Sequence, residues 1–315
     1  MCIRDSTSQG ALKVGLKNFV NSFFKNKKTR SVQLKAIEQL DDGHQIHVSI
    51  KFSRQIIFDF TGTSKVHPFN LNANISIVYS AVIYVLRLLC ATSDADQQIE
   101  IPLNEGLMRN VKIILPNSFL HPDFSDDPMT CPAVVGGNTE VSQRLVDTLL
   151  KALGLAACSQ GTMNNFLFGN KNFGYYETIC GGVGAGNGFD GRSAVHQHMT
   201  NTKITDPEEM ELRYAVRLHE FSIRKKSGGK GKWKGGNGIV RKIEFLENVE
   251  MTLISQHRKE APFGLEGGET GRVGEQFIIK KNGQKKKLKG VDSAEMEFGE
   301  CIVIKTPGGG GYGKE

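Results

Sequence analysis

Short runs in which hydrophobic and polar residues alternate recur along this chain, and such alternation places the apolar side chains on one face of a β-strand. Two runs, at 32–37 and 46–50, flank the sequence Asp41-Asp42-Gly43. This arrangement predicts a β-hairpin, followed by a further strand at 55–60. Four more runs lie at 239–245, 249–254, 276–279 and 301–305. Glycines punctuate them, so we expect a β-rich C-terminal region built as a sandwich or a barrel wall.

Helical spacing of apolar residues is less common. A first helix is predicted from Leu12, Leu16, Phe19, Val20 and Phe23, and a buried helix rich in Ile, Val and Leu is predicted at 72–90. Three asparagines precede this buried helix and are expected to cap it: Asn70, Asn72 and Asn74. A further helix is predicted at 141–157, with Asn138 or Thr139 as its N-cap, and a short one after Asp206-Pro207.

These elements predict an α+β fold, mixed and β-rich, with a few buried helices and a glycine-punctuated C-terminal region. No Pro/Ser-rich linker separates the parts. We therefore expect a ragged N-terminal edge at 1–31, a core lobe at 32–220 and a β-rich lobe of the same domain at 221–315. The first six residues, MCIRDS, are interpreted as a translation artefact or a cloning scar.

Composition excludes several classes of protein. No apolar run approaches the ~20 residues of a membrane helix, and the six cysteines form no CxxC pair, which argues against a structural zinc site. Without a secretory signal, reduced thiols of the cytoplasm are expected. The net charge of +7 comes largely from lysine clusters at 225–234 and 280–289. Aromatic residues are scarce there, so a solvated surface is favoured over nucleic-acid binding.

The 36 glycines are clustered rather than scattered. The clusters lie at 136–137, 181–186, 228–229, 235–236, 267–268 and 308–311. Glycine permits positive φ and close backbone approach, so such clusters suit tight turns or backbone amides directed at an anion. For most of them we expect turns.

The densest polar segment is 175–202, which combines acids, histidines and six glycines. If the segment is a strand, His196 and His198 share one face, where the pair could bind a metal or carry protons. The alternative is a turn-rich loop with solvated histidines. The sequence contains no GxxxxGK[ST], no dinucleotide fingerprint, no HExxH and no GxSxG. ATP must therefore bind elsewhere or not at all.

Two further residues invite a chemical role. Cys158 follows a predicted helix, but thiol acidity increases at helix N-termini and not at C-termini, so a buried structural thiol is expected. Arg144 could reach an anion, although such a residue more often pairs with a surface acid.

Twelve short segments occur in one order: DFTGT at 59–63, IPLNEG at 101–106, VVGGN at 134–138, SQR at 142–144, CSQGTMNN at 158–165, YYET at 175–178, GGVGAG at 181–186, DG at 190–191, HMTNT at 198–202, SGGKG at 227–231, GGNGIVR at 235–241 and TPGGGGYG at 306–313. This set resembles the hydantoinase B/oxoprolinase family, and most closely the C-terminal part of its 5-oxoprolinase members. The resemblance covers roughly 32–313.

The resemblance implies an ATP-dependent hydrolase of cyclic amides, in the cytoplasm and in glutathione metabolism. A hydantoinase A-type ATPase, as a subunit or a fused domain, would phosphorylate the lactam oxygen of 5-oxoproline, and water would open the ring to glutamate. The alternatives are a subunit of a hydantoinase or of an enzyme like acetone carboxylase, and a non-catalytic module that scaffolds an ATPase partner. We expect neither nucleic acid nor a membrane as a partner. We expect the protein to form a homo-oligomer.

Site residues are assigned on the same basis. Glu177 or Asp190 would orient the water, and His196 or His198 would transfer its proton. The expected substrate-binding residues are Asn164, Asn165, Tyr176, Gly181, Gly182, Asn201 and Thr202. The last two would contact the phosphate or the ring amide.

Two departures from the family pattern stand out. Where that pattern runs GGGCGAG, this chain has Cys180-Gly181-Gly182-Val183-Gly184-Ala185-Gly186, so one glycine is replaced at a position that tolerates a small side chain. The upstream section rich in Asn, Asp and His, where relatives hold a divalent metal, matches no segment here. We therefore expect a truncated chain that is inactive alone, with any metal ligands outside it.

Overall fold

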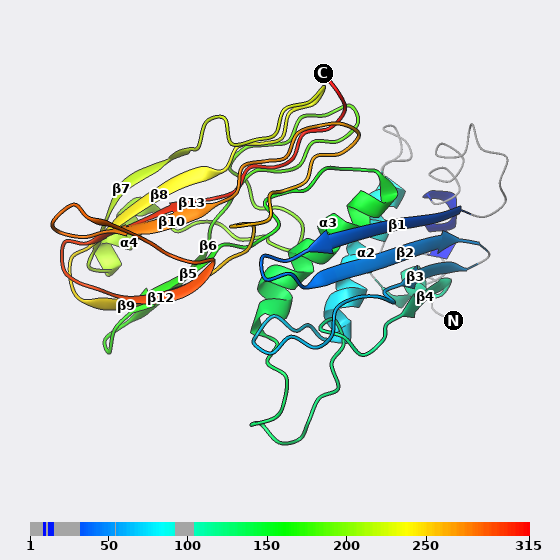
Figure 1. Ribbon diagram of the computed structural model, residues 1–315, viewed down its shortest axis with the longest axis horizontal. Coiled ribbons are helices and arrows are strands. Elements are labelled where there is room, and N and C mark those ends of the chain that lie inside the picture. Colours follow the sequence, from blue (N-terminus) through cyan, green and yellow to red (C-terminus); the bar gives the residue numbers. More distant parts are fainter. Residues whose placement is uncertain (1–8, 11, 16–31, 54, 92–103) are drawn as a thin grey trace. The chain divides into compact units, whose positions relative to one another are not determined.

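The computed structural model describes residues 9–10, 12–15, 32–53, 55–91 and 104–315, and divides into two compact units (Figure 1). Unit 1 comprises Met1–Glu38, Gln45–Gly137 and Thr148–Leu153, and unit 2 comprises Gln39–His44, Asn138–Asp147 and Gly154–Glu315. The lobe boundary expected at residue 221 falls inside strand β7 (Val216–Ile223) of unit 2. Most of the first predicted helix lies outside the described residues. Within the described part of the chain, no helix is long and apolar enough to cross a membrane.

Unit 1 contains a four-stranded sheet in the order β1-β2-β3-β4. Its strands are β1 (Val32–Gln39), β2 (Gln45–Phe52), β3 (Ile56–Asp59) and β4 (Val111–Ile114), with a short 3-10 helix, η1 (Glu105–Met108), before β4. β3 pairs antiparallel with β2 and parallel with β4. Gly43 has φ +97° in the turn between β1 and β2. The predicted hairpin and third strand are confirmed.

Helix α2 (Ile75–Ala91) of unit 1 confirms the predicted buried helix. Val78, Val82 and Leu86 on its inner face are fully buried. Asn74 caps its first turn, because the Asn74 side chain accepts a hydrogen bond from the Ile77 amide at 3.3 Å. Asn72 does not cap the helix but lies fully buried, with hydrogen bonds to the loop before it.

Helix α3 (Ser142–Leu153) follows a π-helical turn, η2 (Gly137–Val141). The helix predicted at 141–157 is therefore present, but the predicted cap at Asn138 or Thr139 and the predicted C-terminal end are wrong. Asn138 and Thr139 lie inside the π-turn, and Gly154, with φ +67°, ends the helix four residues early by adopting a left-handed conformation. π-turns are rare and are frequent at functional sites.

Unit 2 is built on two antiparallel sheets that share one hydrophobic core (Figure 1). The five-stranded sheet has the order β11 (Lys285–Lys287), β10 (Glu275–Ile279), β13 (Cys301–Lys305), β8 (Ile239–Phe245) and β7. The four-stranded sheet has the order β12 (Val291–Met296), β9 (Val249–Ile254), β5 (Asn165–Gly169) and β6 (Gly174–Thr178). Phe166, Phe168 and Leu253 of one sheet pack with Ile243 and Phe245 of the other. Of the two expected arrangements, a sandwich or a barrel wall, unit 2 has the sandwich, and the α+β class is confirmed.

A short helix, α4 (Pro207–Arg213), precedes β7. The Asp206 side chain accepts a hydrogen bond from the Glu208 amide at 2.9 Å, so Asp206 is the N-cap and Pro207 occupies the first turn, as predicted. All four C-terminal runs predicted as strands are strands.

Beyond the sandwich, unit 2 contains what we call the glycine layer, formed by the extended segments 181–186, 228–238 and 306–313. Main-chain hydrogen bonds join them: the Gly236 amide donates to Val183 O at 2.8 Å, and the Gly309 amide donates to Gly236 O at 2.9 Å. A Cβ atom on Gly182, Gly236 or Gly309 would approach a neighbouring backbone closer than 3.0 Å. The expectation of turns is thus wrong here, because these glycines permit close packing of backbones rather than positive φ.

Candidate active site

The π-turn and the first turns of α3 bury several polar side chains in unit 2. Glu140, Gln143, Arg144 and Asp147 are each at most 1% exposed. Buried polar groups are unfavourable unless they find partners, so such a concentration marks either a tightly bonded network or a reactive site. Arg144 is fully buried, whereas one expectation placed it at the surface beside an acid. Its guanidinium donates to Gln39 O and contacts the His257 ring.

Asp147, Ser159 and His198 meet at one point of this network. Nε2 of His198 lies 3.1 Å from Asp147 Oδ1 and 3.0 Å from Ser159 Oγ. The Ser159 amide also donates to Asp147 Oδ1 at 3.0 Å, and the Gly184 amide donates to Ser159 Oγ at 3.3 Å. Both partners use the same ring nitrogen, so this is not the relay in which Asp and Ser hold opposite sides of the imidazole. Nε2 of His198 therefore faces both the Asp147 carboxylate and the Ser159 hydroxyl.

Three residues of the network adopt left-handed backbones although they are not glycine. Asn164, His198 and His257 have φ values of +47°, +55° and +56°. Asn and His tolerate this region better than most residues, but each such position still costs about 1–3 kcal/mol. The surrounding structure therefore holds these three side chains in fixed directions, as is common at functional sites.

A second part of the network surrounds Asn164 and Asn165. Asn164 Oδ1 accepts from the guanidinium of Arg258 at 2.8 Å, and Asn165 Nδ2 donates to Glu140 Oε1 at 2.7 Å. Burial raises the pKa of Glu140 to about 8 and lowers the pKa of Arg258 to about 10. The network thus holds a carboxyl group that keeps its proton near neutral pH, close to a guanidinium.

Cys158 and His257 form a buried pair, with Sγ 3.4 Å from Nε2. Burial and the positive charge of Arg144 lower the pKa of His257 well below its usual range. A neutral imidazole cannot form an ion pair with a thiolate. The geometry therefore agrees with the predicted structural role of Cys158, which is fully buried.

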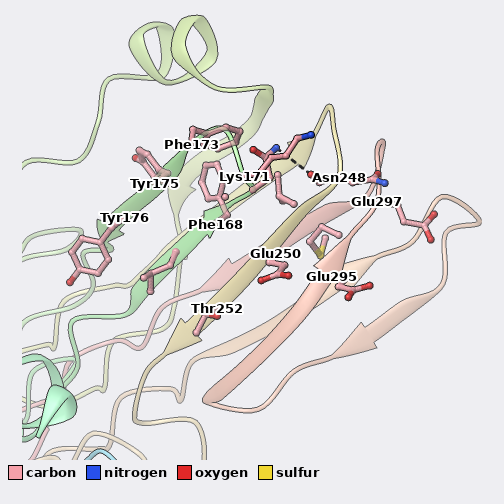
Figure 2. A pocket seen from close by; sticks show the side chains of 16 residues that line it. Phe168, Lys171, Phe173, Tyr175, Tyr176, Asn248, Glu250, Thr252, Glu295 and Glu297 are labelled. Atoms are coloured by element: carbon pink, nitrogen blue, oxygen red, sulfur yellow. Dashed lines mark hydrogen bonds between the residues drawn. The ribbon is translucent and has the colours of Figure 1, made fainter.

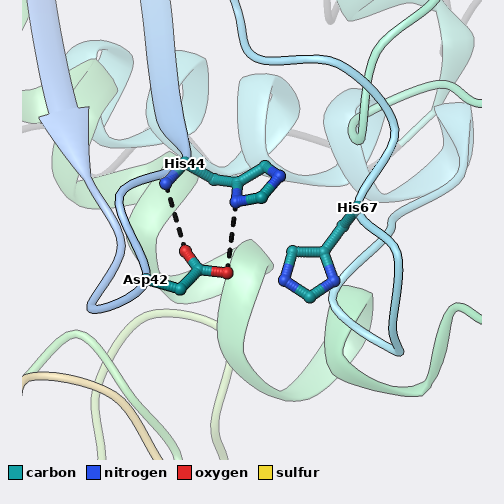
Figure 3. Close-up of side chains that lie close together, drawn as sticks. All are labelled: Asp42, His44 and His67. Atoms are coloured by element: carbon teal, nitrogen blue, oxygen red, sulfur yellow. Dashed lines mark hydrogen bonds and ion pairs between the residues drawn. The ribbon is translucent and has the colours of Figure 1, made fainter.

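The turn at 39–44 belongs to unit 2 and anchors the loop that carries His257 and Arg258. Both carboxylate oxygens of Asp41 accept main-chain amides, from Arg258 at 2.7 Å, Lys259 at 3.0 Å and Glu260 at 2.9 Å. The next acid, Asp42, accepts from the His44 amide at 3.1 Å and lies 3.1 Å from its Nδ1 (Figure 3). Asp41 thereby holds the loop that carries Arg258, whose guanidinium donates to Asn164.

Several buried polar atoms of this region have no hydrogen-bond partner among the described residues. They are Glu140 Oε2, Asp147 Oδ2, His196 Nδ1 and both amide atoms of Gln197. Gln197 is 8% exposed and adjoins His198, while Gln143 binds Gln197 O and Thr200 Oγ1. Native proteins pair nearly all such atoms with protein, water or ligand. Their concentration around α3 and 196–198 marks a place where a polar ligand would find unused donors and acceptors.

The predicted site residues are distributed unevenly with respect to this network. Asn164, Asn165 and His198 lie within it. His196 is half-buried, and burial lowers its pKa. Gly181 packs against the Gln160 side chain, and Gly182 belongs to the glycine layer.

Other predicted residues lie elsewhere in unit 2. Asp190 is exposed and accepts from the Lys234 amide at 2.7 Å. Asn201 and Thr202 are also exposed, and the Thr202 hydroxyl lies 2.6 Å from that of Thr178. Sequence reasoning missed Glu140, Asp147, Ser159, His257 and Arg258. For Glu140 and Asp147 the available signal is a polar stripe along η2 and α3 at 140, 143, 144 and 147, the spacing of one helical face.

Glu177 lies in the sandwich core, where it forms a two-pronged ion pair with Arg241. Its oxygens accept from Nε and Nη2 of Arg241 at 2.8 and 3.0 Å, and one also accepts from the Tyr175 hydroxyl at 2.8 Å. Burial outweighs these partners and raises the pKa of Glu177. With its oxygens occupied in this way, Glu177 is placed to support the sandwich core, while its predicted catalytic role stays a prediction.

Replacing Glu177 with glutamine is expected to destabilise the protein by about 3–5 kcal/mol, because it leaves the Arg241 guanidinium buried without its counter-charge. Urea denaturation followed by circular dichroism measures the loss. The double variant Glu177→Gln with Arg241→Met removes both charges and should recover most of it. A single variant as stable as the parent would refute the structural role.

A groove of about 900 Å³ lies on the outer face of the four-stranded sheet of unit 2, which contains β5, β6, β9 and β12 (Figure 2). Its lining includes Leu167, Tyr176, Glu250, Thr252 and Glu295. Tyr176 is 52% exposed there, and its hydroxyl donates to Asn165 Oδ1 at 2.7 Å. Tyr176, another predicted substrate-binding residue, thus connects the groove to the buried network.

Comparison with known proteins gives one consistent result. A family model described as hydantoinase B/oxoprolinase matches residues 17–315. The chain is 45% identical over 282 residues to a 5-oxoprolinase of Dictyostelium discoideum, covering 88% of this chain and 21% of that protein. It is 45% identical over 287 residues to 5-oxoprolinase 1 of Arabidopsis thaliana, covering 90% and 22%. The chain therefore spans about a fifth of the length of these curated relatives.

Two solved structures have the same fold. The ATP-dependent caprolactamase from Pseudomonas jessenii matches with a TM-score of 0.75 and 20% identity, over 99% of this chain and 55% of that one. A nucleotide-free acetone carboxylase matches with a TM-score of 0.76 and 17% identity, over 96% and 48%. At these low sequence identities, the comparison shows a shared fold and nothing further.

Proposed function

Because the chain belongs to the hydantoinase B/oxoprolinase family, we propose that it supplies the ring-opening half of an ATP-dependent cyclic-amide hydrolase. The reaction is 5-oxo-L-proline, ATP and water to L-glutamate, ADP and phosphate. This proposal rests on the relatives named 5-oxoprolinase and on the cluster of Asp147, Ser159 and His198. Hydantoinase and ketone carboxylase activities are the alternatives within the family, and a scaffold for an ATPase is the non-catalytic one.

The chemistry explains why such a cluster suits the task. A ring amide is a poor electrophile, and phosphorylation of its oxygen makes its carbon open to attack by water. The remaining work is to position the water, take its proton and stabilise the developing charge. In our proposal His198 takes the proton, and Asp147, 3.1 Å from its Nε2, stabilises the imidazolium that results.

Asp147 assumes the water-orienting role first assigned to Glu177 or Asp190. The amides of Asn164 and Gln197 are candidates for the ring amide. Asn201 and Thr202, exposed at the end of the same segment, remain candidates for the phosphate. The unpartnered Oδ2 of Asp147 supports this arrangement, because a bound water would have a carboxylate oxygen to donate to.

In our proposal ATP is bound by a partner and not by this chain. The sequence has no GxxxxGK[ST] loop, and two proteins of the same fold are named ATP-dependent. We propose that a hydantoinase A-type ATPase, as a subunit or a fused domain, phosphorylates the lactam oxygen. We further propose that the enzyme is a cytoplasmic homo-oligomer acting in glutathione metabolism. A divalent metal, if used, would have its ligands outside this chain.

The test is a substrate panel on the complete assembly, with the ATPase and the remaining length of the polypeptide supplied. Release of ADP and of ring-opened product is measured with 5-oxoproline, a hydantoin, a larger lactam and a ketone. The proposal predicts glutamate from 5-oxoproline in amounts that match ADP. Activity on a hydantoin or a ketone alone would replace it with the corresponding alternative, and no activity on any of them would favour the scaffold.

A further inference from the structure

Glu140 occupies an unusual position that the proposed proton transfer to His198 does not use. It lies in the π-turn Gly137–Val141, immediately before the buried face of α3. Its side chain is fully buried. Its Oε1 accepts from Asn165 Nδ2 at 2.7 Å and from the Met163 amide at 3.4 Å. Its Oε2 has no hydrogen-bond partner among the described residues. Oε1 is therefore held in place by the protein, whereas Oε2 is available to bind another group.

The titratable groups around Glu140 come from three elements. Arg144 lies one turn along α3, Arg258 lies in the loop after β9, and Tyr176 lies on β6 behind Asn165. The Thr162 side chain also favours the charged form of the carboxyl group. The two guanidinium groups and Thr162 favour the carboxylate, but burial is the larger effect and raises the pKa to about 8. At neutral pH Glu140 is therefore mainly a carboxylic acid, with an O–H to donate.

The proposed reaction needs such a donor at a defined step. Addition of water to the phosphorylated lactam gives a tetrahedral carbon that bears a hydroxyl, a phosphate and the ring nitrogen. If the C–O bond to phosphate breaks, the lactam re-forms and ATP has been consumed without product. If the C–N bond breaks, the ring opens to an acyl phosphate, which water hydrolyses to the carboxylate. Phosphate leaves readily whereas an amide anion does not, so ring opening requires protonation of the nitrogen.

We infer that Glu140 donates this proton through Oε2 and so determines how much glutamate is formed for each ADP released. The hydroxyl on the tetrahedral carbon forms the carbonyl of the acyl phosphate and releases its proton to solvent. At the same time the C–N electron pair passes to nitrogen, nitrogen gains the Glu140 proton, and Glu140 becomes a carboxylate. Asn165, Thr162 and the Met163 amide, together with nearby Arg258, stabilise that carboxylate until solvent returns the proton. The inference rests on the proposed function and adds a second proton-transfer group to it.

The test is the ratio of glutamate to ADP in the complete assembly carrying Glu140→Gln, which keeps an acceptor for Asn165 but has no acidic proton. Glutamate formation is expected to fall about 100-fold, while 5-oxoproline-dependent ADP release falls only a few-fold. In the parent enzyme the ratio should be constant below about pH 7 and decline as pH rises through about 8, where Glu140 loses its proton. In Glu140→Gln that decline should be absent.

A buried carboxyl outside the network provides the control. Glu300 is 3% exposed and pairs with Lys280 at 2.8 Å. Glu300→Gln should retain the parental ratio. A parental ratio in Glu140→Gln across the whole pH range would overturn the inference. Failure of the parent to release glutamate from 5-oxoproline would instead overturn the proposed function.

A second measurement does not depend on the variant folding. Carbon-13 carboxyl NMR of the unsubstituted chain, labelled in glutamate, should contain one resonance that titrates near pH 8. Absence of any glutamate that titrates above about pH 7 would overturn the inference directly.

Discussion

Replacing Gly236 with alanine is expected to leave unit 2 unfolded. The Gly236 amide donates to Val183 O and its carbonyl accepts from the Gly309 amide, so the residue is held between two other segments. A Cβ atom there would lie closer than 3.0 Å to the main-chain oxygen of Arg192. Backbone atoms on both sides cannot give way as a flexible side chain could. The cost should exceed about 4 kcal/mol, a large part of the ~5–15 kcal/mol that holds a typical domain folded.

Circular dichroism and a thermal melt of the purified variant would measure this effect. Gly174→Ala is the matched control, because Gly174 is exposed at the start of β6 and a Cβ there would meet nothing within 4 Å. We expect Gly174→Ala to melt within a few degrees of the parent. If Gly236→Ala also melted with the parent, the description of the glycine layer would be wrong.

Replacing His198 with asparagine should lower product formation by about 10²–10⁴-fold, the usual contribution of a positioned proton-transfer group. Asparagine suits the test because it tolerates the left-handed backbone of this position, where φ is +55°, better than alanine does. The variant removes the imidazole that faces Asp147 and Ser159 while preserving the turn. Steady-state glutamate release in the complete assembly gives the result, and an unchanged melting temperature shows that the fold is intact.

His219 provides a control of the same chemistry. Its Nε2 lies 2.7 Å from Glu244 Oε2, but the pair sits exposed on the five-stranded sheet. His219→Asn should leave product formation unchanged. Full activity in His198→Asn would remove the imidazole from the proposed mechanism.

The strands show which parts of the fold were predictable. β8 alternates buried and half-buried residues along its whole length, so its pattern was visible in the sequence. β6 was missed because its inward positions are Tyr175 and Glu177 and its outward position is Tyr176. An alternating strand is expected to place its polar residues outward. Glu177 instead points inward, because it pairs with Arg241, 64 residues away. The glycine clusters were evident, but their packing depends on segments far apart in the chain.

The site was predictable to a similar degree. His198, Asn164 and Asn165 stand in segments dense in polar residues, which pointed to them. Asp147 did not stand out, because a polar stripe on an amphipathic helix is usually its solvent face. Here Ser159 and His198 cover that stripe, and only the folded chain brings them to it. Local spacing alone cannot distinguish a covered polar face from a solvated one.

One measurement tests the central claim most directly: glutamate formed from 5-oxoproline in a single turnover of ATP, with this chain present and with it omitted from an otherwise complete assembly. The account predicts stoichiometric glutamate only when the chain is present, and its loss in His198→Asn. Equal amounts of glutamate without the chain would show that the ring is opened elsewhere and would contradict the account.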